Sequence, residues 1–252
     1  MAGHSKWANI QYRKGTQDAR KARLFTRVMR EVQSAARHGG ADPSRNSRLR
    51  LAIERANTAN VPKDRIERAL KRIQGGEAAD SLEEVRYEGY GAGGVAILVE
   101  CLTDNRNRTV SEIRHAFVKA GGNLGADGAV AYLFRRVGLL QYPVGPERAE
   151  PLFDEALDAG AEDVEDGGGG TVTVTVDPEF FEQVRSRLEV AGFTPASGEI
   201  TLQASTQVAV SGDEAASVLK LMASLEELDD VQNLYSNADF SEEAIRQFQD
   251  AS

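Results

Sequence analysis

The sequence predicts an α+β protein in which an N-terminal three-helix bundle precedes an α/β domain that is interrupted by a second, ferredoxin-like α/β domain. Two patterns predict this class. Apolar residues recur every three to four positions through residues 16–75, which is typical of amphipathic helices. Beyond residue 94, short apolar strands alternate with helical segments, which is typical of α/β domains. The chain of 252 residues, 41% of them hydrophobic, is long enough for about two domains.

The first predicted helix runs from Thr16 to Arg37 and carries an apolar stripe at helical spacing. The stripe consists of Ala22, Phe25, Met29, Val32 and Ala36. Arginines follow the same rhythm, displaced by two positions or fewer, which at about 100° per residue places them nearly opposite the stripe. They are Arg20, Arg23, Arg27 and Arg30. We therefore predict that one face of this helix packs and that the other presents a cationic row to solvent.

Two shorter helices complete the predicted bundle. The second spans about residues 44–59, and the third begins after Pro62, because proline favours the first helical position. The third helix ends at Gly75-Gly76. The apolar stripes of these helices comprise Leu49, Ala52, Ile53 and Ala56, followed by Ile66, Ala69, Leu70 and Ile73. Arg45, Arg48 and Arg55 are expected to point outward from the second helix.

The remainder of the chain is predicted to contain a complete β-α-β-β-α-β unit, the ferredoxin-like arrangement, between residues 137 and 205. Its expected elements are Leu139–Tyr142, Glu147–Ala159, Asp163–Glu165, Thr171–Val176, Pro178–Ala191 and Ile200–Gln203. Before this unit, the apolar run 95–102 predicts a central strand, Asn107–Ala120 a helix and Tyr132–Phe134 a further strand.

A second α/β domain is expected to be divided by that unit. Residues 77–136 supply only one helix, and the missing elements are predicted as helix Asp213–Leu228 and strand Val231–Tyr235. We therefore place four parts along the chain. They are a bundle at 1–76, a discontinuous domain at 77–136 and 206–240, an inserted domain at 137–205 and a tail at 241–252.

The charge changes sign between these regions. Residues 1–75 carry 18 lysines and arginines against 6 acids, whereas residues 76–252 carry 12 against 33, within a total net charge of −9. The first region therefore has a net charge of +12 and the second of −21. Such asymmetry favours a nucleic-acid partner for the basic region. Intramolecular attraction between the two regions is the alternative.

A segment ahead of the bundle interleaves aromatic and cationic residues, namely Lys6, Trp7, Tyr12, Arg13 and Lys14. Cations suit phosphate contacts, and a ring offers a stacking face to an unpaired base. Trp7 is the only tryptophan, and a hydrophobic plug against the bundle is an equally good interpretation.

The segment 104–109 (DNRNRT) places Arg106 and Arg108 just before a predicted helix, at a position that favours anions. One interpretation is a second phosphate contact within the acidic region. The other is a helix capped by asparagine or threonine, with both arginines paired to local acids.

The sequence argues against catalysis, a metal or a cofactor. The glycines at 89, 91, 93 and 94 precede a strand instead of joining a strand to a helix, so a turn or close backbone approach is expected there. His4, His38 and His115 lie far apart, without the spacing of metal ligands. Asp229 and Asp230 could pair in a cleft, but so many acids make accidental pairs inevitable. Cys101 is expected to be a core residue.

No apolar run is long enough for a membrane-spanning helix, and the N-terminus has no secretory h-region. We expect a cytoplasmic protein with no membrane partner and no small-molecule substrate. An arginine-rich transit peptide is the weaker alternative, because these arginines belong to a well-patterned helix.

Long motifs resemble the YebC family, whose members include PmpR-type transcriptional regulators. They are MAGHSKWANI, QDARKARLFTRVMRE, RLRLAIERA, YEGYGAGGVAILVECLTDNRNRTVSEIRHAFVKAGGNLGADGAVAYLF, ALDAGAEDV and LEELDDVQNLYSN. This resemblance covers nearly the whole chain. It implies a three-helix N-terminal domain and two ferredoxin-like α/β domains, one inserted into the other. It also implies one of two activities: DNA-binding transcriptional regulation, or action at the ribosome, including relief of stalling at proline-rich stretches.

Three functions therefore remain open. The first is a translation factor that binds ribosomal or transfer RNA, and it is favoured because contacts dominated by Arg and Lys suit backbone binding. The second is a transcriptional regulator bound to promoter DNA, and the third is a protein-interaction scaffold. The residues predicted to contact nucleic acid are Lys6, Trp7, Tyr12, Arg13, Lys14, Arg20, Lys21, Arg23, Arg27, Arg30, Arg48, Arg106 and Arg108.

Overall fold

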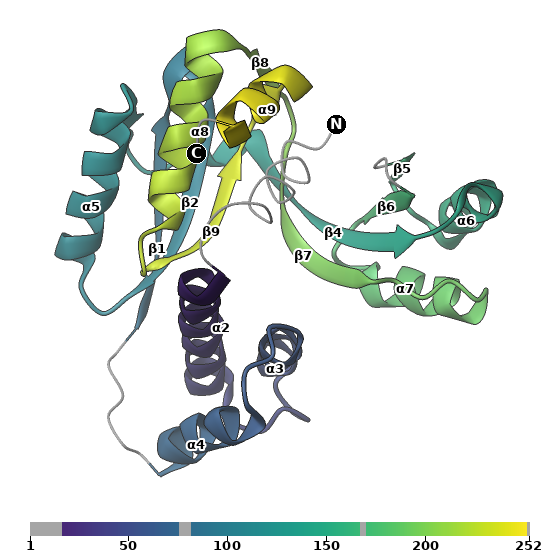
Figure 1. Cartoon of the computed structure of the whole chain (residues 1–252). Helices are drawn as coiled ribbons and strands as arrows, with labels where there is room; N and C mark the ends of the chain where they lie inside the picture. Colours follow the sequence, from purple (N-terminus) through teal and green to yellow (C-terminus); the bar gives the residue numbers. More distant parts are fainter. Residues whose placement is uncertain (1–16, 76–81, 167–169, 251–252) are drawn as a thin grey trace. The chain divides into compact units, whose positions relative to one another are not determined.

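The computed structural model describes residues 17–75, 82–166 and 170–250. These residues form two compact units: one lies within 132–207, and the other combines 17–131 with 208–250. The predicted fold class is confirmed, because three N-terminal helices precede two α/β domains, one of which is inserted into the other (Figure 1).

The bundle consists of α2 (Gln17–Gly39), α3 (Ser47–Thr58) and α4 (Lys63–Gln74). Val32 and Leu49 lie fully buried in its core. Asn46 fixes the corner between α2 and α3. Its Oδ1 accepts the N–H of Leu49 at 3.0 Å, and its Nδ2 donates to the carbonyls of Ala35 and Gly40 at 2.8 and 2.7 Å. A single side chain therefore caps α3 and also satisfies carbonyls at the end of α2.

An antiparallel sheet in the order β3-β1-β2-β9 forms the discontinuous domain. Its strands are β1 (Glu83–Tyr90), β2 (Ala96–Thr103), β3 (Asn123–Leu124) and β9 (Val231–Ser236). The central strand predicted at 95–102 is confirmed as β2. Helices α5 (Arg106–Lys119) and α8 (Gly212–Glu226) pack against each other beside this sheet (Figure 1).

The glycine-rich segment predicted to be a turn joins β1 to β2 through the short helix η1 (Ala92–Gly94). Gly93 and Gly94 have φ values of 66° and 73°, a left-handed region that favours glycine. At Gly89, a Cβ atom would lie 2.6 Å from both the Asn123 carbonyl oxygen and the Phe117 ring. The segment connects two antiparallel strands, so it lacks the strand-to-helix context of a dinucleotide-binding loop.

Besides β1 and β3, three short elements in this unit were not predicted. Strands β8 (Val208–Val210) and β10 (Ala238–Phe240) pair in parallel. They are followed by α9 (Glu242–Asp250), which buries Ala244 and Phe248 and packs against α8. The C-terminal tail predicted at 241–252 is therefore a helix over most of its length.

The inserted domain has the predicted β-α-β-β-α-β order. Its elements are β4 (Phe134–Pro143), α6 (Pro146–Ala159), β5 (Asp163–Asp166), β6 (Thr171–Val176), α7 (Phe181–Val190) and β7 (Ser197–Ala204). The sheet is antiparallel, in the order β5-β6-β4-β7. Tyr142, Leu152 and Leu188 are fully buried in its core.

The start of this domain differs from the prediction. Leu139–Tyr142 and Phe134 belong to one long strand, β4, whereas Tyr132 and Leu133 lie in the short helix η2 (Ala131–Leu133). Residues 134–141 pair continuously with β7. This pairing joins the two predicted strands into one, because it provides hydrogen-bond partners for the backbone groups of the polar residues between them. The boundary predicted between residues 136 and 137 falls inside this strand.

Candidate nucleic-acid interface

The structure describes the side chains of only part of the predicted interface. Lys6, Trp7, Tyr12, Arg13 and Lys14 lie outside the described residues. Arg20 and Lys21 lie in the first turns of α2, where the backbone alone is described. The aromatic and cationic segment therefore stays a prediction.

Three arginines of α2 face the C-terminal end of α8. Arg30 Nη1 donates to the Asp229 carbonyl at 2.6 Å, and an Nη of Arg27 donates to the carbonyl of Glu226. Arg23 lies 3.7 Å from the carboxylate of Glu227. Helix C-termini attract cations, because their last carbonyls carry partial negative charge. The arginines of α2 thus form an electrostatic contact between the bundle and the discontinuous domain.

This contact corrects the prediction that the arginines of α2 form a solvent-exposed row. Arg27 and Arg30 are partly buried, and only Arg23 of these three is exposed. Burial lowers the pKa of the Arg27 guanidinium from its ordinary value, although the nearby Glu226 carboxylate opposes this shift. The apolar stripe identified the face that packs within the bundle, but it carried no information about a second packed face of the same helix.

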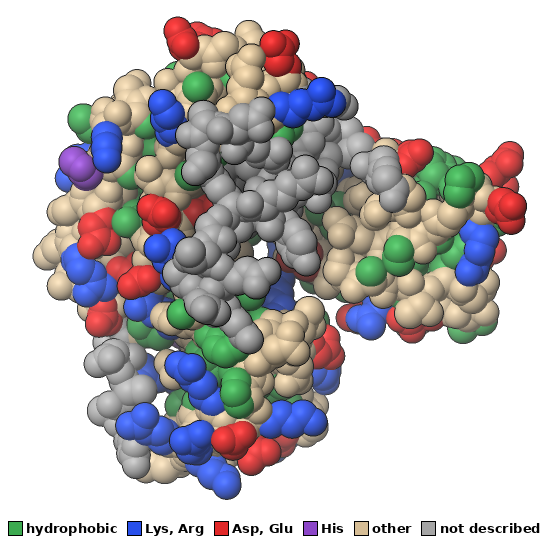
Figure 2. Space-filling model, in the orientation of Figure 1, with side chains coloured by type: hydrophobic (Ala, Val, Ile, Leu, Met, Phe, Trp, Pro, Cys, Tyr) green, Lys and Arg blue, Asp and Glu red, His purple; other side chains and the backbone are tan. Residues whose placement is uncertain are grey.

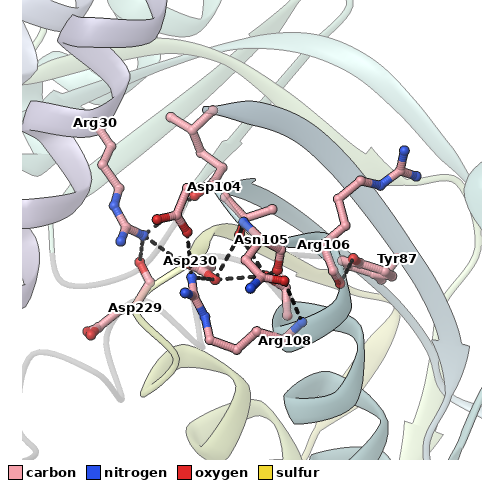
Figure 3. A network of polar contacts seen from close by, with 11 residues as sticks. Arg30, Tyr87, Asp104, Asn105, Arg106, Arg108, Asp229 and Asp230 are labelled. Atoms are coloured by element: carbon pink, nitrogen blue, oxygen red, sulfur yellow. Dashed lines mark hydrogen bonds and ion pairs between the residues drawn. The ribbon is translucent and has the colours of Figure 1, made fainter. Parts of the chain in front are cut away.

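Asp230 is the centre of the polar network in Figure 3 and lies just before β9. Its side chain is only 3% exposed. Its carboxylate forms ion pairs with Arg30 and Arg108, each with an N–O distance of 2.8 Å. The hydroxyls of Thr103 and Thr109 donate to Oδ2 at 3.0 and 2.7 Å. Burial alone would raise the pKa of Asp230, but these hydrogen bonds outweigh it and hold the pKa below its ordinary value.

The two arginines of segment 104–109 differ in their surroundings. Arg108 bonds Asp230 and also Asp104, at 2.8 Å, and these bonds raise its pKa above the ordinary value. Asn105 caps α5 by accepting the N–H of Arg108 at 3.1 Å. Arg106 is 67% exposed and lies 4.0 Å from Glu83. The capped-helix interpretation therefore accounts for Arg108, while Arg106 keeps an accessible guanidinium.

The largest group of exposed cations in the described bundle lies on α4, a helix for which the sequence pattern predicts no contact residue. The other exposed cations of the described bundle are Arg23, Arg45, Arg48 and Arg50. Figure 2 shows lysine and arginine side chains crowded over this part of the bundle. The exposed cations of α4 are Lys63, Arg65, Arg68, Lys71 and Arg72. Their sequence signal was available, because arginines recur at steps of three and four beside the apolar stripe of this helix. On α3, Arg48 is exposed but forms an ion pair with Glu84, and Arg55 pairs with Glu31 at 3.0 Å.

Within the described ranges, no group of three or more His, Cys, Asp or Glu side chains is placed to hold a metal ion. Cys101 is buried in β2, as predicted. No described helix is long and apolar enough to cross a membrane.

Family models match both regions of the chain. Residues 5–76 match the model described as the TACO1/YebC protein N-terminal domain. Residues 82–238 match the model described as the TACO1/YebC second and third domain. The two matches together include almost every element described above.

Similar proteins cover nearly the full length. A probable transcriptional regulatory protein of Methylococcus capsulatus is 55% identical over 247 residues, which is 97% of this chain and 98% of that protein. A protein of the same name from Coxiella burnetii is 51% identical over 97% of this chain and all of its own length. The crystal structure of a conserved hypothetical protein from Aquifex aeolicus has a TM-score of 0.80 at 43% identity, covering 91% of this chain and 94% of that one.

Proposed function

Because this chain belongs to the TACO1/YebC family, we propose that it is a non-catalytic, nucleic-acid-binding regulator of gene expression. The observation that carries this proposal is the net charge of +12 in residues 1–75, within a chain of net charge −9. In the described bundle, α4 exposes five cations while its apolar side faces the bundle core. A concentrated cationic surface binds polyanions even when the whole protein is acidic.

Within this class, a translation factor that acts on ribosomal or transfer RNA is the favoured function, with relief of stalling at proline-rich stretches as its expected role. The exposed face of α4 presents arginine, lysine and acidic side chains. Arginine and lysine suit contacts to phosphate, which fix position without reading sequence. Double-stranded RNA is recognised largely through its shape and through contacts to its phosphates and 2′-hydroxyls, so such a surface suits RNA.

Transcriptional regulation through promoter DNA is the second candidate. It is favoured by the names of the relatives, which are called probable transcriptional regulatory proteins. A sequence-reading regulator needs side chains that reach base edges, commonly from a helix inserted in the major groove. The two candidates therefore differ in the nucleic acid bound and in the dependence on sequence.

Crosslinking in cells, followed by sequencing of both the bound RNA and the bound DNA, separates the candidates. The favoured function predicts that ribosomal or transfer RNA dominates the recovered fragments, without discrete promoter peaks. Discrete promoter peaks with little RNA would instead establish the DNA-binding candidate. Failure to recover either nucleic acid above the level of an uncrosslinked control would contradict the proposal as a whole.

A further inference from the structure

We infer that the exposed face of α4, centred on Arg65, Arg68 and Lys71, is the surface of the bundle that contacts the sugar–phosphate backbone. This inference rests on the proposed function and assigns it to one helix face. It replaces the arginines of α2, which the sequence pattern had favoured, as the main phosphate contact of the described bundle.

The geometry of α4 separates its charged residues from its packed ones. Ile66 is buried and Ala69 and Ile73 pack partly against the bundle core. At about 100° per residue, Lys71 and Arg68 project about 165° and about 135° from the mean direction of these apolar residues, whereas Arg65 lies about 75° from it. Lys71 and Arg68 therefore occupy the half of the helix that faces away from the core, and Arg65 lies exposed at its flank.

Within the described part of the chain, Arg65, Arg68 and Lys71 are less engaged by partners than Arg27 and Arg30 of α2. Arg68 has an exposed partner, Asp64, at 3.2 Å within the same helix. Exposed pairs of this kind are weak and exchange readily with solvent and other anions. In contrast, Arg27 and Arg30 are partly buried against the end of α8. Binding of phosphate by Arg27 or Arg30 would require this contact to break, whereas Arg65, Arg68 and Lys71 are already exposed.

The dimensions of the face fit a nucleic-acid strand. Residues 65–71 rise about 9 Å along the helix axis. A strand of a duplex carries one phosphate per about 3.4 Å of its axis, so long side chains from this length can reach two or three phosphates. Each neutralised phosphate contributes about −0.7 to −0.9 to the slope of log affinity against log salt.

The test compares the full-length chain with a variant that carries Arg65→Gln, Arg68→Gln and Lys71→Gln. The probes are a short hairpin RNA and a DNA duplex of the same sequence, titrated between about 50 and 200 mM salt. We expect the variant to lose roughly 50- to 200-fold in affinity near physiological salt and to reduce the magnitude of the salt slope by about 2 to 3. The RNA and DNA arms show which backbone the face prefers.

A matched control carries Arg114→Gln, Lys119→Gln and Lys220→Gln, which change the net charge equally at exposed cations of α5 and α8. A second variant, Arg65→Lys, Arg68→Lys and Lys71→Arg, keeps the charge and should keep most of the affinity. Circular dichroism checks folding, and if the triple variant melts early the three single variants replace it, each with about a fourfold loss.

The assignment to α4 would be overturned if the triple variant, or every single variant, bound nucleic acid as tightly as the control. That result leaves nucleic-acid binding by the protein intact. Absence of salt-dependent binding in the unmodified protein would instead defeat the proposed function itself.

Discussion

The ionised carboxylate of Asp230 joins three parts of the same unit, because its partners come from α2, the end of β2 and the start of α5. Asp230→Asn should lower the free energy of unfolding by about 1–3 kcal/mol at pH 7, because the amide cannot accept all of these bonds and leaves buried donors unsatisfied. Denaturant unfolding at several pH values measures this cost.

The direction of the pKa shift of Asp230 determines how the stability difference between the two proteins depends on pH. The folded-state pKa of Asp230 lies below the unfolded value of about 3.9. The stabilisation is therefore complete above that pH and is lost as the pH falls through the folded pKa. The difference between the two proteins should shrink below about pH 4; a constant difference from pH 7 to pH 3 would show that charge at Asp230 is unimportant.

The reactivity of the Cys101 thiol reports on the packing of β2 in the unmodified protein. Burial, assisted by the Asp230 and Glu100 carboxylates, raises the pKa of its thiol to about 12. Only the thiolate reacts, and about one thiol in 10⁴ is ionised at pH 8. We expect a disulfide reagent at pH 8 to label the native protein far more slowly than the denatured protein. Rapid labelling of the native protein would show that β2 is accessible.

At the scale of elements, the contact between α2 and the end of α8 makes a further prediction. Arg30→Ala removes a bond to Asp230 and another to the Asp229 carbonyl, and should cost about 1–3 kcal/mol of stability. Arg45→Ala is the matched control, because Arg45 is exposed and such surface changes usually stay within about 0.5 kcal/mol. Thermal melts compare the two. Equal melting temperatures would mean that the contact adds no stability.

Periodicity predicted the elements whose own residues carry a strong pattern. The three bundle helices, β2, β6 and α8 follow from apolar spacing, and their predicted ends lie near the observed ones. Strand β1 lacks such a pattern; its place depends on pairing with β2 and β3. Strands β8 and β10 are short and depend on each other across many intervening residues. Long-range pairing of this kind is not encoded in local spacing.

The same limit explains the errors in the predicted site. Helical spacing separates apolar from charged faces, but it cannot tell an exposed charge from one that packs against a distant partner. Two acids, Asp230 and Glu88, are buried despite their charge. Glu88 accepts hydrogen bonds from the N–H groups of Gly128, Val130 and Ala131. The arginines of α2 are cations that pack against a distant partner in the same way. The exposed face of α4 does have a local signal, because its arginines recur at steps of three and four beside its apolar stripe.

At the scale of the whole molecule, the net charge of residues 1–75 has the opposite sign to the net charge of the chain. A net charge of −9 predicts weak attraction to polyanions, whereas the +12 of residues 1–75 predicts strong local attraction. Glu226, Glu227 and Asp230 partly neutralise that charge on α2, and among the described residues α4 keeps the largest group of exposed cations. Binding should therefore be electrostatic in origin and sensitive to salt.

A salt titration of the full-length protein on single-stranded RNA tests the central claim most directly. If about six phosphates are neutralised, log affinity should fall linearly with log salt at a slope near −4 to −5. A slope near zero, or no measurable affinity at the lowest salt concentration, would contradict the claim that this protein binds nucleic acid through the cations of its bundle.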